Sequence, residues 1–313
     1  MVIATLCVHV SRSARITNQH DGSPTSSCSS LLAAAVRGAH AVDPCVGNTA
    51  AQFGSRAPKD DGRLLRQSVA RWCLGSMPIE QVIDLAKSVR LDGVELLDPP
   101  DIQKVRAAKL ACPVANGPTT IADGLNRIEH HDDIMKRAEI LFPQISSAGA
   151  PLVIVFAGDR RGLDDAKGLE NCVAGLKRLL PIAQKSNLGV VMELLNSRVD
   201  HKDHMGDHTA WGLQLCEAVA DHRFGLLFDI YHMQIMDGDV IRTIQKAAPW
   251  ILHYHTAGVP GRGPLDTKQE LYYPAIIRAI VATGYRGFIG HEFMPSKDAK
   301  AELKAAIAAC VGD

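Results

Sequence analysis

The segment DAKGLENCVAGLKRLLPIAQKSNLGVVMELLN, residues 165–196, places a helical pattern directly before a strand pattern. Its first part predicts a helix with one buried face, because apolar residues recur at the i, i+3, i+4 and i+7 spacing. These residues are Leu169, Cys172, Val173, Leu176, Leu179 and Leu180. Its last part, GVVMELLN, is a short apolar run bounded by polar residues, which predicts a buried strand. The segment is therefore a helix–strand unit.

The same alternation runs along the chain from residue 64. Strands are predicted at 67–73, 92–97, 111–116, 151–158, 189–196, 224–231, 251–258 and 287–293. Helices are predicted at 78–89, 101–109, 124–149, 165–186, 209–221, 238–248, 271–283 and 296–310. Alternating strands and helices imply parallel pairing through right-handed crossovers.

The length of this region favours a barrel over a doubly wound sheet. Residues 64–313 number about 250, the usual size of a (β/α)₈ barrel. Against the doubly wound sheet, no GxGxxG follows the first strand and no GxxxxGK[ST] is present. We therefore predict an α/β fold, a (β/α)₈ TIM barrel that forms the catalytic domain over residues 64–313.

Residues 1–63 differ in composition from the rest. They are rich in Ser, Ala, Thr and Gly, include SPTSSCSS at 23–30 and show no sustained period. We predict a low-complexity, disordered extension in front of the barrel. Scattered arginines with few acidic residues are also typical of an organellar transit peptide. A cytoplasmic location is expected, with organellar targeting, export and an over-long start left open.

Composition limits the classes of partner. Lysine and arginine total 34, as do aspartate and glutamate, so the formal net charge is zero. A protein that binds nucleic acid normally carries a basic excess, and the apolar runs are too short for a membrane span. Eight cysteines without a CxxC motif indicate reduced thiols. We expect a small-molecule partner, no nucleic acid and no membrane, with a homodimer or homotetramer left open as the assembly.

Four metal-competent side chains stand at the carboxyl ends of the last four predicted strands. Glu193 interrupts VVMELL, Asp229 follows GLLF, His255 ends LHYH and Glu292 closes IGHEF. Loops at these ends build the open face of a barrel. Alone, a carboxylate there can cap the next helix and a histidine can be a core residue. Together they predict a site for one divalent cation, Mn²⁺ or Mg²⁺ first, with Co²⁺ or Zn²⁺ as further options.

These residues lie in motifs that resemble a known family. The motifs are SVARWC (68–73), GLENCVAGLKRLLPIAQ (168–184), MELLNSRVDHKDHMGDHTAWG (192–212), LLFDIYHMQIMDGDV (226–240), HYHTAGVPGR (253–262) and GFIGHEFMP (287–295). In this order they resemble the hydroxypyruvate isomerase group of the xylose-isomerase-like barrel superfamily. The resemblance implies that Glu193, Asp229, His255 and Glu292 are the metal ligands. Bacterial hydroxypyruvate isomerases have glutamine at the third position, whereas related ketose 3-epimerases have histidine.

The resemblance also implies a reaction. The metal holds a carbonyl and the adjacent hydroxyl of the substrate, an enediolate forms, and Glu193 and Glu292 transfer the proton. The expected enzyme is an isomerase that converts hydroxypyruvate to tartronate semialdehyde. His232 is expected to contact a substrate oxygen. Arg262 is expected to bind a substrate carboxylate, with an ion pair to a neighbouring acid such as Asp266 as the alternative.

Further expectations concern the surroundings of the site and the rival functions. Asn196 and the polar run 198–208 are expected to contact substrate or form an exposed lid, and Trp72 to form an apolar wall or core. A ketose 3-epimerase or another sugar isomerase is the alternative activity. A non-catalytic metal-binding barrel is the alternative of a different class. An abasic-site endonuclease is disfavoured, because the third and fourth strand ends, VANGP and VFAGDR, contain no histidine.

Overall fold

The computed structural model describes residues 63–311 of the 313. The extension predicted over residues 1–63 lies, except for Arg63, outside the described residues. The boundary between the two predicted domains therefore stays a prediction.

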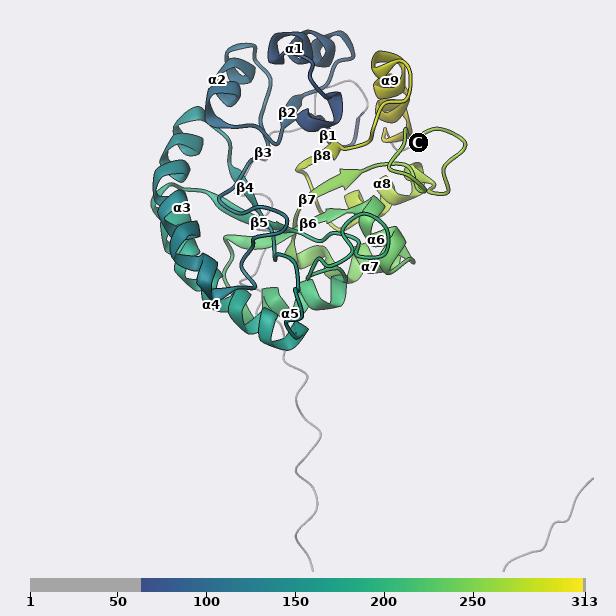
Figure 1. Cartoon of the computed structure of the whole chain (residues 1–313). Helices are drawn as coiled ribbons and strands as arrows, with labels where there is room; N and C mark the ends of the chain where they lie inside the picture. The colour runs from purple at the N-terminus through teal and green to yellow at the C-terminus, as the bar shows by residue number, and fades with distance from the viewer. Residues whose placement is uncertain (1–62, 312–313) are drawn as a thin grey trace, which may run out of the picture. The chain divides into compact units, whose positions relative to one another are not determined.

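The described residues form a ring of eight parallel strands, which confirms the predicted (β/α)₈ barrel. The strands are β1 (Arg66–Ala70), β2 (Gly93–Glu95), β3 (Val114–Ala115), β4 (Leu152–Val155), β5 (Gly189–Glu193), β6 (Phe224–Asp229), β7 (Ile251–Thr256) and β8 (Phe288–His291). They pair in the order β2-β1-β8-β7-β6-β5-β4-β3. Isolated parallel bridges, Gly93 with Ala111 and Leu97 with Ala115, connect β2 to the segment around β3. These bridges complete the ring that Figure 1 shows from one end.

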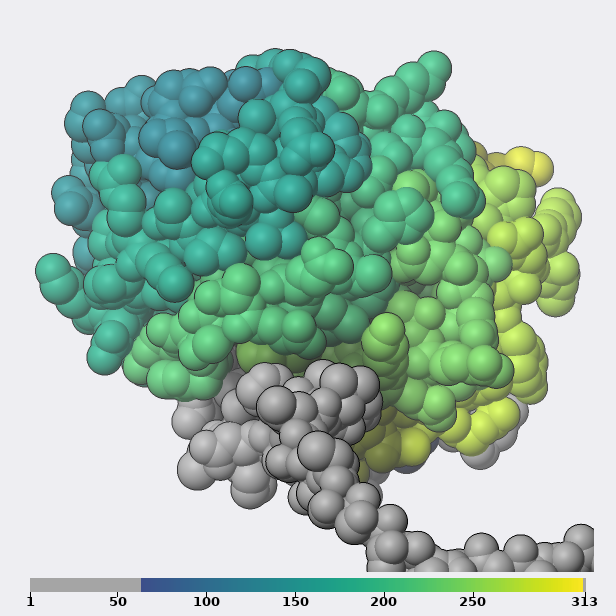
Figure 2. Space-filling view, turned by 90° about the horizontal axis from the view of Figure 1, so that it is seen from below, coloured from purple at the N-terminus to yellow at the C-terminus, as the bar shows by residue number. Residues whose placement is uncertain are grey.

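Helices follow the strands and surround the ring (Figure 1). They are α1 (Ile79–Ser88), α2 (Pro99–Ala107), α3 (Ile128–Ala148), α4 (Asp165–Lys185), α5 (Thr209–Val219), α6 (Ile230–Met236), α7 (Val240–Ala247), α8 (Tyr273–Ala282) and α9 (Ala299–Ala309). Two 3₁₀ turns lie at Arg71–Leu74 and Ala248–Trp250. In the space-filling view of Figure 2, teal and green segments from the middle of the sequence lie against one another.

Helix α6 was not predicted, and the strand predicted over 224–231 ends earlier, at Asp229. The Asp229 carboxylate accepts hydrogen bonds from the backbone N–H groups of Tyr231 and His232. An aspartate in this position is an N-cap, which satisfies amide groups that a helix start would leave without partners. This cap starts helix α6 at Ile230, within a run of mostly apolar residues. The apolar pattern alone assigned the start of this run to the preceding strand.

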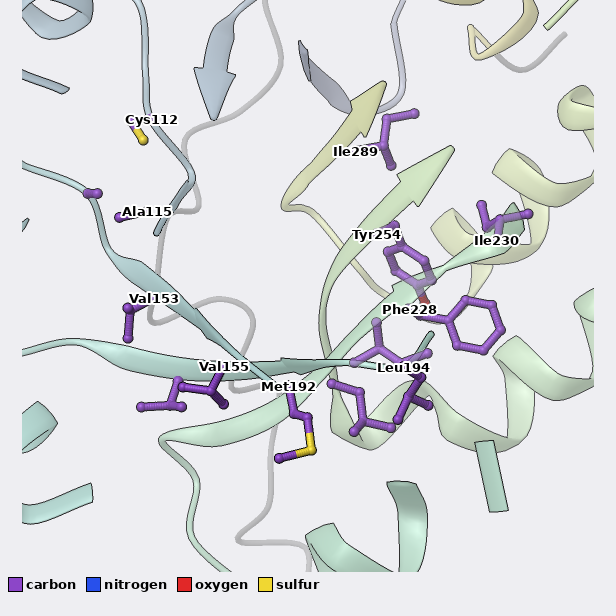
Figure 3. Close-up of a cluster of buried hydrophobic side chains, with 14 of the residues drawn as sticks. Cys112, Ala115, Val153, Val155, Met192, Leu194, Phe228, Ile230, Tyr254 and Ile289 are labelled. Carbon is purple, nitrogen blue, oxygen red and sulfur yellow. The ribbon is translucent and has the colours of Figure 1, made fainter. Parts of the chain in front are cut away.

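Side chains alternate between the inside and the outside of the ring because the strand period is two. A small internal cluster fills the barrel axis and consists of Val114, Leu152, Ile154, Val191, Leu227 and Leu252. Alternate residues such as Val153, Met192 and Phe228 belong to the larger apolar core between strands and helices (Figure 3). Above the internal cluster, the inward positions become polar, and these positions form the candidate site.

The described residues can be compared with two expectations from the sequence, reduced cysteines and the lack of a membrane span. All five described cysteines are buried and free: Cys73, Cys112, Cys172, Cys216 and Cys310. Among residues 63–311, no helix combines the length and apolar character needed to cross a bilayer.

Candidate metal centre

The structure brings the four expected ligands together at the carboxyl end of the barrel. Glu193 and Asp229 are the last residues of β5 and β6, His255 lies one residue before the end of β7, and Glu292 directly follows β8. One ligand atom from each lies within 4.8 Å of the others, and all four side chains are buried. This spacing is compatible with a common cation, because ligand bonds to divalent ions are about 2.0–2.6 Å long.

The imidazole of His255 lies between the acidic groups. Its Nδ1 is 2.6 Å from Oε2 of Glu292 and 3.5 Å from Oε1 of Glu193. Burial by itself lowers the pKa of His255, but Glu292, Glu193 and Glu95 outweigh it and raise this pKa well above its usual value. Nδ1 is the histidine nitrogen that faces the two glutamates of the cluster, Glu193 and Glu292.

The two glutamates of the site have opposite electrostatic surroundings. Burial and the neighbouring charge of Glu292 raise the pKa of Glu193 to about 7. Burial also opposes ionisation of Glu292, but Arg262 and His255 outweigh it and hold this pKa far below its usual value. Two acids pushed in opposite directions can take different parts in proton transfer.

An unpaired buried atom indicates what the cluster can hold. Oε1 of Glu193 is buried and accepts no hydrogen bond from any described residue. Burial likewise raises the pKa of Asp229, to about 6, in spite of nearby Arg262. Carboxylates in such surroundings are stabilised by a bound cation, and three carboxylates with one imidazole suit a divalent ion. The residues therefore fit the expected metal.

Arg262 lies inside the site and pairs with two of the expected ligands. Its Nη2 donates to Oδ2 of Asp229 at 2.9 Å and to Oε2 of Glu292 at 2.5 Å, and its Nε donates to the backbone oxygen of Glu292. The alternative expectation, an ion pair with a neighbouring acid, is therefore met, but by Asp229 and Glu292 and not by Asp266, which accepts from the backbone of Lys268. A guanidinium this close to the acids is placed to meet an anionic substrate group. Its contact with substrate stays a prediction.

Trp72 also contacts the site through its polar edge. Its indole Nε1 donates to Oε1 of Glu292 at 2.5 Å, and the guanidinium of Arg262 lies 5.2 Å from the ring centroid. The side chain is 44% exposed. Of the two expected roles, core packing is therefore wrong, and a wall of the site agrees with these contacts.

His232 and Asn196 form a buried pair beside the cluster. The backbone N–H of Asn196 donates to Nδ1 of His232 at 3.2 Å, and Nε2 of His232 lies 2.8 Å from Nη1 of Arg262. Burial and the charge of Arg262 lower the pKa of His232 well below its usual value. The Asn196 amide oxygen accepts from the backbones of Val199 and Asp200, and its NH₂ group contacts Asp200 and His232. Both the amide oxygen and the NH₂ group of Asn196 are therefore occupied by contacts within the protein.

The polar run 198–208 is exposed at 198–200, 202 and 203, whereas residues 204–207 are buried against the barrel. Arg160, in the loop after β4, makes ion pairs with Asp165 and Asp207 and donates to the backbone oxygen of His204. His204 is 0% exposed, and burial lowers its pKa to about 3. The expectation of an exposed polar lid is therefore wrong for this histidine, because neighbouring loops fold over it.

The prediction missed one acidic residue of the barrel interior, Glu95. It ends β2 and is 0% exposed, and its carboxylate lies 2.8 Å from Nε2 of His255. Burial opposes its ionisation, but His253 and His255 outweigh it and lower its pKa to about 2. The sequence carried the signal, since VELL at 94–97 repeats the acid-in-apolar-strand pattern of MELL at 192–195.

The sequence matches one protein family over most of the barrel. The profile of the xylose isomerase-like TIM barrel family matches residues 83–310. A putative hydroxypyruvate isomerase of Homo sapiens is 32% identical over 117 residues, which are 37% of this chain and 42% of that relative. A 2-oxo-tetronate isomerase of Cupriavidus necator is 32% identical over 121 residues, 39% of this chain and 46% of that relative. The chain thus spans less than half the length of each of these curated relatives.

Solved structures share the fold at lower identity. The crystal structure of an AP endonuclease, family 2, from Brucella melitensis superposes with a TM-score of 0.70 at 23% identity, covering 77% of this chain and 96% of that one. A D-psicose 3-epimerase with D-tagatose from Clostridium cellulolyticum H10 superposes with a TM-score of 0.67 at 13% identity, covering 78% and 96%. At these identities the likeness supports the barrel, and the chemistry has to be argued from the site.

Proposed function

The chain belongs to the xylose isomerase-like TIM barrel family, and within it we propose a metal-dependent isomerase of small hydroxy-carbonyl acids. The reaction that we propose is conversion of hydroxypyruvate to tartronate semialdehyde through an enediolate. The observation that carries the proposal is the buried cluster of Glu193, Asp229, His255 and Glu292, whose ligand atoms lie within 4.8 Å of one another. Relatives named hydroxypyruvate isomerase and 2-oxo-tetronate isomerase support the substrate class.

Glu193, Asp229, His255 and Glu292 would hold one divalent ion, Mn²⁺ or Mg²⁺ first and Co²⁺ or Zn²⁺ as further options. When bound, the ion supplies Lewis-acid polarisation of substrate oxygens. The protein's part is to present three carboxylates and one imidazole nitrogen in a buried pocket, where charge interactions are stronger than in water.

Proton transfer is assigned to Glu193 and Glu292. One carboxylate takes a proton from C3 of hydroxypyruvate, the same or the other group returns a proton to C2, and the hydroxyl proton passes from the oxygen on C3 to the oxygen on C2, so the atoms balance without a further reactant. Burial raises the pKa of Glu193 above its usual value, so this carboxylate is a better proton acceptor than an exposed glutamate. Glu292, which Arg262 and His255 keep ionised, is the matching acceptor.

Arg262 and His232 are assigned to the substrate. The guanidinium is charged and lies beside the neutral imidazole of His232, so the pair offers a cation and a polar ring to a carboxylate and its neighbouring oxygen. Asn196 holds His232 through its backbone N–H and side chain. We therefore place Asn196 beside the substrate as a group that orients His232.

The test is a substrate panel of two- to six-carbon hydroxy-carbonyl compounds, with Mn²⁺, Mg²⁺ and Co²⁺ supplied separately and products read by NMR. We expect turnover of hydroxypyruvate and little turnover of neutral ketoses. Failure on every small keto acid, with activity on a ketose, would overturn the acid specificity.

A ketose 3-epimerase is the second candidate, and one observation favours it. His255 occupies the position where the sequence resemblance places histidine in ketose 3-epimerases and glutamine in bacterial hydroxypyruvate isomerases. The panel separates the two activities, because an epimerase inverts C3 of a ketose and leaves the carbonyl at C2. Metal binding without turnover of any compound would indicate a non-catalytic metal-binding barrel.

A further inference from the structure

The carboxylate of Glu95 lies inside the barrel, below the candidate metal cluster, and contacts three polar side chains. It accepts hydrogen bonds from Oγ of Ser68 at 2.8 Å and Nε2 of His253 at 3.2 Å, and Nε2 of His255 lies 2.8 Å from its Oε1 in an ion-pair contact. All four side chains are buried. A buried carboxylate with two hydrogen bonds and an ion-pair contact is held in one place, since any movement would weaken these interactions.

His255 thus contacts two sets of carboxylates through its two ring nitrogens. Nε2 faces Glu95, and Nδ1 faces Glu292 and Glu193. A neutral imidazole carries one proton, and the nitrogen that donates it cannot bind a metal. In the neutral, metal-binding form of His255, a proton on Nε2 toward Glu95 leaves Nδ1 with its lone pair toward the cluster.

We propose that Glu95 is a positioning residue for the metal centre: it orients the His255 ring and keeps the proton on Nε2, so that Nδ1 is the ligand. The proposal rests on the metal site proposed above. A carboxylate that accepts from a ligand histidine raises the basicity of the ligand nitrogen and prevents rotation of the ring.

The neighbouring strand β8, where Gly290 pairs with His255, leaves space for this carboxylate. Gly290 lies in β8, and a Cβ added to it would be 1.8 Å from Oε1 of Glu95 and 2.9 Å from Cδ2 of His255. Neither group can move aside without losing the 2.8 Å contact that joins them. The glycine therefore leaves the space that the Glu95–His255 contact occupies.

Glu95, His253 and His255 are also close enough to hold an ion themselves. The distances between their nitrogen and oxygen atoms, 2.8 and 3.1 Å, are those of direct hydrogen bonds, and Ser68 donates to the same carboxylate. A second ion would have to displace these protons. We therefore expect one metal per chain, and two equivalents would overturn the proposal.

The experiment compares the full chain with its Glu95→Gln variant, using Co²⁺ and Zn²⁺ as probes. Chelator competition measures the dissociation constant, and the visible absorption of the Co²⁺ form reports the ligand geometry. We expect the affinity of Glu95→Gln to fall about 10- to 100-fold, with a changed Co²⁺ spectrum. Wild-type affinity together with a wild-type spectrum would overturn the proposal.

Two further variants separate this role from a structural one. Asp92→Asn removes a buried carboxylate that pairs with Arg63 away from the site, so it should lower the thermal midpoint and leave the metal affinity unchanged. Gly290→Ala should weaken metal binding as Glu95→Gln does, which keeps the test open if the glutamine variant does not fold. If the wild-type chain binds neither ion, the proposed function fails; if it binds and Glu95→Gln binds equally well, only the role of Glu95 fails.

Discussion

The indole of Trp72 donates a hydrogen bond to Oε1 of Glu292 at 2.5 Å, and so connects the turn after β1 with the residue that follows β8. The other oxygen of Glu292 faces His255 and Arg262. Each carboxylate oxygen therefore has its own partners. Trp72 fixes the orientation of an acid to which both metal binding and proton transfer are assigned.

Replacement of Trp72 by phenylalanine removes this donor and keeps an aromatic ring near Arg262. A hydrogen bond to a charged group contributes about 1.5–3 kcal/mol, so kcat/KM should fall by at least about tenfold, since 1.36 kcal/mol corresponds to a factor of ten. Steady-state kinetics measure the change. Trp250→Phe is the control, because Trp250 lies in the turn before β7, at the other end of that strand, and should leave kcat/KM unchanged.

The Glu292→Gln variant should keep the fold and lose proton transfer. The amide preserves the shape and the hydrogen-bonding edge but cannot accept the proton, and general acid–base catalysis is worth about 10²–10⁴ in rate. Deuterium incorporation from D₂O into substrate, followed by NMR, measures the step, with circular dichroism as the control for folding. Near-normal turnover by this variant contradicts the assignment.

The Arg262→Lys variant should lose more activity on acidic substrates than on neutral ones. Lysine keeps the positive charge but loses the planar fork that contacts Asp229, Glu292 and His232. We expect KM for a keto acid to rise at least tenfold, or about 1.4 kcal/mol. An equal loss for keto acids and neutral ketoses would mean that Arg262 serves only to hold the ligands.

Removal of divalent metal should abolish activity and lower the thermal midpoint. A ligand at about 100 times its dissociation constant stabilises the folded state by about 2.7 kcal/mol, so several degrees should be lost on treatment with a chelator. Mn²⁺, Mg²⁺ or Co²⁺ should restore both quantities in scanning calorimetry and activity assays. A midpoint and a rate that ignore both chelator and added metal would remove the cation from the proposal.

Acid should destabilise the protein through His204. Its pKa is about 3 in the folded chain, against an ordinary histidine value of 6.5, so the unfolded state binds more protons between these two values. The stabilising effect of a neutral His204 is thus complete above pH 6.5 and is lost as pH falls toward 3, by at most about 1.4 kcal/mol per pH unit.

Urea unfolding of wild type and His204→Phe at pH 7 and pH 5 measures the effect of His204. The free energy of unfolding of the wild type should fall more steeply with acid than that of the variant. Equal slopes for the two proteins would show that His204 does not cause the acid sensitivity.

Local sequence was sufficient to predict most of the helices and strands and to place the four expected ligands at strand ends. Helical spacing at Leu169, Cys172 and Leu176 is repeated within one or two turns, so it is visible without knowledge of the rest of the chain. Glu193 and Asp229 could be placed at the same end of the barrel because parallel strands all end on one face. Helix α6 escaped because its start depends on the Asp229 cap rather than on apolar periodicity.

The contacts inside the site required the closed barrel. Glu95 and His253 are 158 residues apart in the chain, and Trp72 and Glu292 are 220 apart. Strand β1 pairs with β2 on one side and with β8 on the other. Strand β2 therefore lies close to β8 and β7, and the inward side chains of these strands meet in the interior. The sequence by itself determined the barrel and which residues stand at its strand ends, because both are local properties. Only the tertiary structure decided the partners of His255, Glu292 and Arg262, because strand register and ring closure bring distant residues within hydrogen-bonding distance.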